Sequence, residues 1–99
     1  MEAEIDGFLA WCRAERGLSE NTMDAYSRDL LRLREYLLHR QIHEPSAVTS
    51  AHLSDWLLAL HERGLAAPSI ARHRVAMRQL FQFLVDEGIL SQNPSELIS

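Results

Sequence analysis

The sequence contains no lysine and only one cysteine. With Cys12 as the sole cysteine, no internal disulfide can form and no paired-cysteine metal motif is present, so we expect a reducing, cytoplasmic environment. All ten positive residues are arginines, which assigns no function by itself because genomic composition also sets arginine usage.

Long apolar runs are also missing, and Gly and Pro are scarce, with four and three residues. No run approaches the roughly 20 apolar residues that span a bilayer, and the first residues, MEAEID, are acidic where a secretory signal needs basic residues. Hydrophobic residues make up 46% of the chain and charged residues 24%. This composition is typical of a soluble globular protein, so we expect one domain over 1–99 and no membrane partner.

Positive charge is low overall but concentrated in one segment. The net charge is −4, which taken alone argues against binding to nucleic acid. Residues 1–62 hold eleven acids and six arginines, whereas residues 63–85 hold four arginines and no acid. A basic segment therefore lies inside an acidic chain.

Apolar residues recur at helical spacing throughout, which predicts an all-α fold, a compact bundle of four main helices. We expect helices over about 3–15, 20–40, 50–63 and 68–87, with Ser19 and either Thr49 or Ser50 as N-caps and Pro68 in a first turn. A short fifth helix could start within SELI, residues 95–98.

The helical periodicity also predicts which side chains are buried. Leu31 and Leu38 should widen the apolar face of the second helix, whereas Arg28 and Arg32 should face solvent. On the fourth helix, Arg72 should point away from the core. Arg78 should lie on a flank, and His73 and Arg74 at the borders of the apolar face. The predicted core residues are Ile5, Phe8, Leu9, Cys12, Met23, Tyr26, Leu30, Leu33, Leu37, Leu53, Trp56, Leu57, Leu60, Ile70, Met77, Leu80, Phe81 and Leu84.

Motifs for catalysis or metal binding are absent from the sequence. There is no glycine-rich phosphate loop and no nucleophile elbow; Tyr26 lies on a core stripe, and Tyr36 has no recognisable base beside it. His39 and His43 lie at a helix end and have no third ligand in the pattern. We therefore expect no catalytic residues, no cofactor, no metal and no small-molecule substrate.

Polar residues gather at the starts of the second and fourth helices. Ser19, Asn21 and Thr22 lie at the first of these, and Ser69, Arg72 and His73 at the other. A helix N-terminus offers free N–H groups and a positive dipole end, so it binds phosphate readily. If the two starts lie side by side, they form a surface suited to a DNA major groove. The alternative, that the serines only cap and the arginines only solubilise, stays open.

Two runs carry a family resemblance: FLAWCRAERGLSENTMDAYSRDLLRLREYL, and LHERGLAAPSIARHRVAMRQLFQFLVDEGILSQNP. With GLSENT at 17–22, Tyr26, Arg28-Asp29-Leu30 and Asn93-Pro94, they resemble the N-terminal core-binding, SAM-like domain of XerC/XerD-type tyrosine recombinases, relatives of phage integrases. The similarity covers nearly the whole chain.

The resemblance implies a helical half-clamp on double-stranded DNA, acting in site-specific recombination, DNA integration or chromosome dimer resolution. It implies a separate C-terminal domain that carries the catalytic residues, so this fragment would not be an enzyme. It also implies assembly with other recombinase protomers, as a tetramer on two DNA sites. The positions implied to contact DNA are Ser19, Asn21, Thr22, Arg28, Ser69, Arg72 and Arg78.

The sequence departs from the family pattern at two positions: many relatives have an arginine where this chain has Ser27, and an apolar residue where it has Arg74.

Two other functions stay open. One is a stand-alone helical module that binds a protein partner through Trp11 or Leu90. The other is a small helix-turn-helix regulator, although a tight turn between two short helices is not apparent.

Overall fold

A computed structural model describes residues 1–98, and within them every regular element is helical. The predicted all-α bundle of four main helices is confirmed. The elements are α1 (Glu2–Trp11), the π-helical turn η1 (Cys12–Arg16), α2 (Glu20–His39), the 3₁₀ turn η2 (Pro45–Ala47), α3 (Ser50–Glu62) and α4 (Ala67–Asp86).

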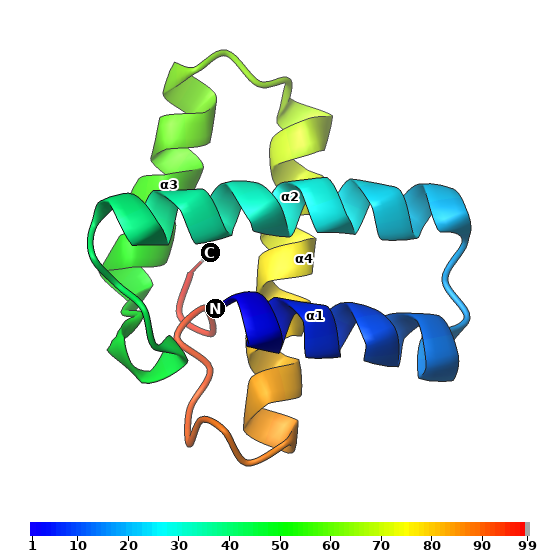
Figure 1. The fold of residues 1–99 in the computed structure, drawn as a ribbon. Coiled ribbons are helices and arrows are strands. Elements are labelled where there is room, and N and C mark those ends of the chain that lie inside the picture. Colours follow the sequence, from blue (N-terminus) through cyan, green and yellow to red (C-terminus); the bar gives the residue numbers. More distant parts are fainter. Residues whose placement is uncertain (99) are drawn as a thin grey trace.

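The helices form two crossed pairs (Figure 1). α1 and α2 run side by side in opposite directions, and α4 passes behind both of them with α3 as its neighbour. The most extensive contact joins α2 and α4. Because these two helices cross instead of running in parallel, α4 meets α2 along a limited segment, and the residues at this crossing decide how the two fit together.

The helix ends follow from local chemistry. The Ser19 hydroxyl accepts from the Thr22 backbone N–H at 3.2 Å, so the predicted cap of α2 is confirmed. Thr49, and not Ser50, caps α3 by accepting from the His52 N–H. The first helix continues to Arg16 as a π-helical turn and ends at Gly17, whose φ of 59° is left-handed and costs little only in glycine.

The core matches the predicted apolar faces of all four helices, with Leu9 and Ile70 only half-buried. Two expectations about α2 are wrong: Leu31 and Leu38 are exposed, so its buried arc is narrower than predicted. The fully buried residues also include Asp29 and His73, which the periodicity did not place inside.

The C-terminal segment contains no fifth helix within the described residues. Positions 94–97 form a single turn, in which Asn93 Oδ1 accepts from the backbone N–H and the hydroxyl of Ser95. One turn fixes several dihedrals for very few hydrogen bonds, so it does not propagate as a helix without more residues. Across residues 1–98 no helix combines the length and hydropathy needed to cross a membrane.

Candidate nucleic-acid interface

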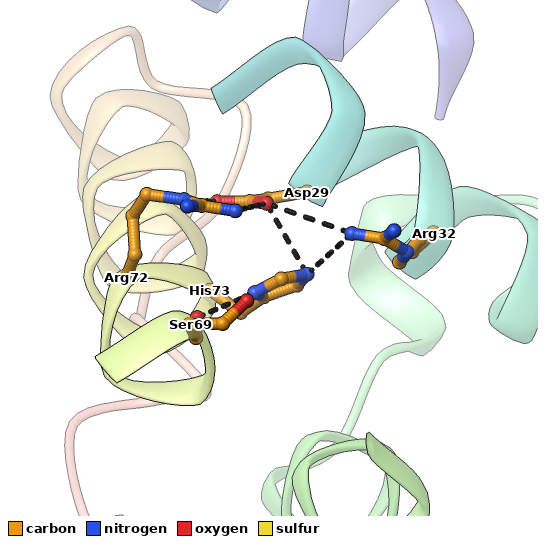
Figure 2. A network of polar contacts seen from close by, with 5 residues as sticks. All are labelled: Asp29, Arg32, Ser69, Arg72 and His73. Carbon is orange, nitrogen blue, oxygen red and sulfur yellow. Dashed lines mark hydrogen bonds and ion pairs between the residues drawn. The ribbon is translucent and has the colours of Figure 1, made fainter. Parts of the chain in front are cut away.

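A buried carboxylate joins α2 to α4 at their crossing (Figure 2). The side chain of Asp29 has 0% exposure, and the guanidinium of Arg72 binds it through two parallel hydrogen bonds. Arg72 Nε donates to Oδ2 at 2.8 Å, and Arg72 Nη2 donates to Oδ1 at 2.7 Å. These bonds raise the pKa of Arg72 above its usual value. Such a pair is charge-assisted and geometrically specific.

Two further nitrogen-bearing side chains approach the same carboxylate. His73 Nε2 lies 3.2 Å and Arg32 Nη1 lies 3.9 Å from Asp29 Oδ1. His73 Nδ1 lies 2.6 Å from the Ser69 carbonyl, which can only accept, so this ring nitrogen carries the proton. His73 Nε2 also lies 3.0 Å from Arg32 Nη1, so it is close to both Asp29 and Arg32. Asp29, Arg32, Arg72 and His73 form one network, which we call the Asp29 network.

Beside this network, the N-terminal half of α2 and the outward side of α4 form a corner of the molecule. On α2, Thr22 lies within about 20° of Asp29 around the helix axis, so both side chains point toward the α4 side. On α4, Gln79 lies two turns beyond Arg72 on the same stripe, and its side chain accepts from Arg16 Nη1. We define the α2–α4 corner by Ser19, Thr22, Asp29, Arg72 and Gln79.

Arginines border this corner and outnumber its single buried carboxylate. Arg16 approaches from the end of η1, and Arg72 lies inside the corner. Asn21, Arg28 and Arg32 share an adjacent stripe of α2, spaced by seven and four residues. Arg28 is exposed and makes no hydrogen bond or ion pair to any residue between 1 and 98. The surface combines these arginines with hydroxyl and amide groups and with the exposed carboxylate of Glu20, which pairs with Arg13.

The two helix starts do not lie side by side, which corrects the sequence-based expectation. α2 reaches Asp29 nine residues after its first residue, about 14 Å along the axis, whereas Arg72 lies about 8 Å into α4. Figure 1 shows the start of α2 at one end of the molecule and the start of α4 at another. The helices meet through their bodies because the Asp29 network occupies the crossing.

The seven predicted contact residues therefore fall into separate places. Ser19, Asn21, Thr22, Arg28 and Arg72 lie at the corner or on the stripe next to it. Ser69 is half-buried, and its carbonyl binds His73. Arg78 lies about 120° around α4 from Arg72 and donates to the carbonyl of Ile98, so it belongs to a different side of the helix.

The sequence-based interpretation missed two members of the site. Asp29 appeared only as part of a motif, and Arg32 was assigned to the solvated face, yet both belong to the Asp29 network. The available signal was the position of Asp29, which lies about 40° from Leu33 on the wheel and therefore at the border of the buried arc. A buried carboxylate requires partners, and the acid-free segment supplies one of them, Arg72 on α4.

Comparison with known proteins identifies the family. Residues 5–88 match the family described as phage integrase, N-terminal SAM-like domain. The chain belongs to this family. Among its curated relatives are a tyrosine recombinase XerC of Xylella fastidiosa, 36% identical over 95 residues, and a tyrosine recombinase XerD of Bradyrhizobium diazoefficiens, 38% identical over 99 residues. A tyrosine recombinase XerD of Agrobacterium fabrum is 40% identical over 96 residues.

These matches cover nearly all of this SAM-like chain but only a part of each relative. They include 96%, 99% and 97% of the chain, and 32%, 31% and 29% of the respective relatives. The chain thus spans about a third of the length of these recombinases and corresponds to their SAM-like domain.

Proposed function

We propose that this chain is the DNA-binding N-terminal domain of a site-specific tyrosine recombinase, and that its α2–α4 corner grips duplex DNA in the major groove. The observation that carries the proposal is the position of Arg28 and Arg72 at the crossing of α2 and α4, on the side of α2 that also carries Asn21 about two turns toward its start. Membership of the integrase SAM-like family supports it.

The electrostatics favour a local contact over general attraction to DNA. The chain carries −4 overall, so DNA must approach the surface where the arginines collect. At the start of α2, Ser19 and Thr22 share a hydroxyl hydrogen bond and one caps the helix, whereas the Asn21 side chain is exposed and available to a ligand. Side chains of this kind, beside a helix N-terminus, bind phosphate oxygens and base edges.

The catalytic groups and the biological role lie outside this chain in the proposal. The nucleophile and the residues that stabilise the phosphate would belong to the remaining two-thirds of the recombinase. The complete protein would assemble as a tetramer on two DNA sites in the cytoplasm, in DNA integration or in the resolution of chromosome dimers. The names of the XerC and XerD relatives favour the chromosomal role.

Duplex binding as a function of salt tests the proposal. We expect the logarithm of the association constant to fall linearly with the logarithm of salt concentration, with a slope of about −0.9 for each phosphate neutralised. Arg28→Ala should make that slope shallower by about one, since an exposed arginine without a protein partner is suited to phosphate. Fluorescence anisotropy with a labelled duplex measures both quantities.

Arg40→Ala is the matched control, because it removes the same charge at the other end of α2, where Arg40 stacks on Tyr36. It should leave the slope unchanged. Absence of binding to any duplex, together with self-association in sedimentation experiments, would instead favour the protein-interaction module. The exposed part of such a module would be Trp11, since Leu90 is half-buried against the core.

A further inference from the structure

We propose that Arg72 reads a guanine in the major groove through the free edge of its guanidinium, and that Asp29 is the positioning residue that orients this edge. The inference rests on the proposed function, because it names the base that the α2–α4 corner would recognise. It is carried by the two-bond contact between Arg72 and a fully buried carboxylate.

The geometry of the contact determines which donors remain available. Asp29 occupies the side of the guanidinium formed by Nε and Nη2. The end formed by Nη1 and Nη2 still has two parallel N–H groups, and the Arg72 side chain remains 38% exposed. Two parallel donors match the O6 and N7 acceptors that guanine presents side by side in the major groove.

The charge of the pair favours a base over a phosphate as the partner. Asp29 neutralises Arg72 locally, so the pair brings little net charge to a phosphate group. The free edge of the guanidinium nevertheless keeps its two parallel donors. These can bind a guanine edge, which is uncharged and does not require a net positive partner. Arg28 is the contrasting case, because it has no carboxylate partner in the described chain and keeps its full charge for the DNA backbone.

The rest of the Asp29 network fixes the carboxylate in turn. His73, itself fully buried, bonds the Ser69 carbonyl on one side and lies 3.2 Å from Asp29 on the other. Arg32 closes the α2 side of the network. An arginine held in one orientation before binding loses less conformational entropy when it contacts a base, which favours discrimination.

Selection from duplexes with randomised centres tests the inference with the 99-residue chain. The wild-type chain should enrich a guanine at one position, and Arg72→Ala and Asp29→Asn should both lose the preference at that same position. We expect the loss in discrimination to be at least about fivefold. Arg28→Ala is the matched control, and it should weaken binding to all sequences while the preference remains.

A change in the DNA provides a test whose main measurement uses only the wild-type chain. Replacing the enriched guanine with 7-deazaguanine removes the N7 acceptor; it should weaken wild-type binding by at least about fivefold and leave Arg72→Ala unaffected. Adding Asp29→Asn to Arg72→Ala should cause no further loss of preference. If Asp29→Asn does not fold, Asp29→Glu keeps the charge but displaces it by one methylene and should also lose the preference.

The outcomes separate this inference from the proposed function. Failure to bind any duplex contradicts both. Salt-dependent binding with an unchanged guanine preference in Arg72→Ala, or with no guanine preference in the wild type, contradicts the inference and leaves the proposed function standing. An unchanged preference in a folded Asp29→Asn variant contradicts the positioning role of Asp29.

Discussion

At the scale of single residues, Asp29 and Arg72 differ in how completely they are removed from water. Asp29 is fully buried, whereas the Arg72 side chain keeps 38% of its exposure. Arg72→Ala leaves a buried carboxylate whose nearest remaining guanidinium, that of Arg32, is 3.9 Å away. We therefore expect Arg72→Ala to lower the free energy of unfolding by about 3 kcal/mol, as in other broken buried pairs.

Asp29→Asn should cost less, about 1–2 kcal/mol, because the amide oxygen still accepts one bond and the arginine can rehydrate. Urea denaturation of the two variants measures the difference. If Asp29→Asn lowers the free energy of unfolding more than Arg72→Ala does, the prediction is wrong. Leaving the carboxylate without its arginine would then be less costly than removing its charge.

The Asp29 network also shows what the sequence could not predict at this scale. Helical periodicity placed His73 at a border and Arg72 away from the core, since each helix was considered alone. Their environment is set by α2, which crosses α4 at this point and contributes Asp29 and Arg32. Contacts between residues 43 positions apart depend on the crossing of the helices, which local periodicity does not encode.

At the scale of elements, different residues at the N-terminus of α2 serve folding and binding. Ser19 accepts the Thr22 N–H, whereas the exposed Asn21 side chain makes no hydrogen bond within residues 1–98. Ser19→Ala should lower the free energy of unfolding by about 1 kcal/mol, because a helix cap is lost. Asn21→Ala should leave stability within about 0.5 kcal/mol and weaken duplex binding.

Thermal melts and anisotropy titrations of the two variants provide these measurements. Thr49→Ala is the matched control for the capping effect, because Thr49 makes the same bond at the start of α3, to His52. It should lose stability as Ser19→Ala does. A destabilised Asn21→Ala that binds DNA normally would contradict the assignment of Asn21 to the ligand.

Helix boundaries were predictable where one residue decides them. Ser19 begins α2 as predicted, and the first helical segment extends one residue beyond the predicted end, to Arg16 before Gly17. α4 begins at Ala67, one residue before the predicted Pro68. The exposure of Leu31 and Leu38 was not predictable, because the width of a buried arc depends on how many neighbours pack against the helix, and the sequence does not give that number.

At the scale of the whole molecule, the crossed helix pairs convert a negatively charged chain into one with a localised positive surface. About five acid-free turns of α4, residues 67–85, cross the body of α2, and the buried Asp29 offsets part of their charge where the helices touch. Arg28 is exposed on the adjacent stripe of α2, beside the crossing. Net charge alone would have excluded DNA, so the distribution of charge is the informative quantity.

The same architecture predicts that the chain binds DNA without cutting it. A tyrosine recombinase needs an accessible tyrosine hydroxyl, but Tyr26 is buried against the core, and the Tyr36 hydroxyl is buried without a hydrogen-bond partner in the described structure. Burial also raises the pKa of Tyr36 above its ordinary value of 10.0, so its neutral, weakly nucleophilic form dominates at pH 7.

Incubation with a nicked duplex, followed by a denaturing gel, should therefore give no covalent protein–DNA adduct, whereas a native gel of the same mixture should show a shifted complex. Tyr26→Phe and Tyr36→Phe should leave that shift unchanged, since the Tyr36 hydroxyl is buried and the Tyr26 residue is only 8% exposed. An adduct that disappears in either variant would place a nucleophile in this chain and contradict the separation of binding from catalysis.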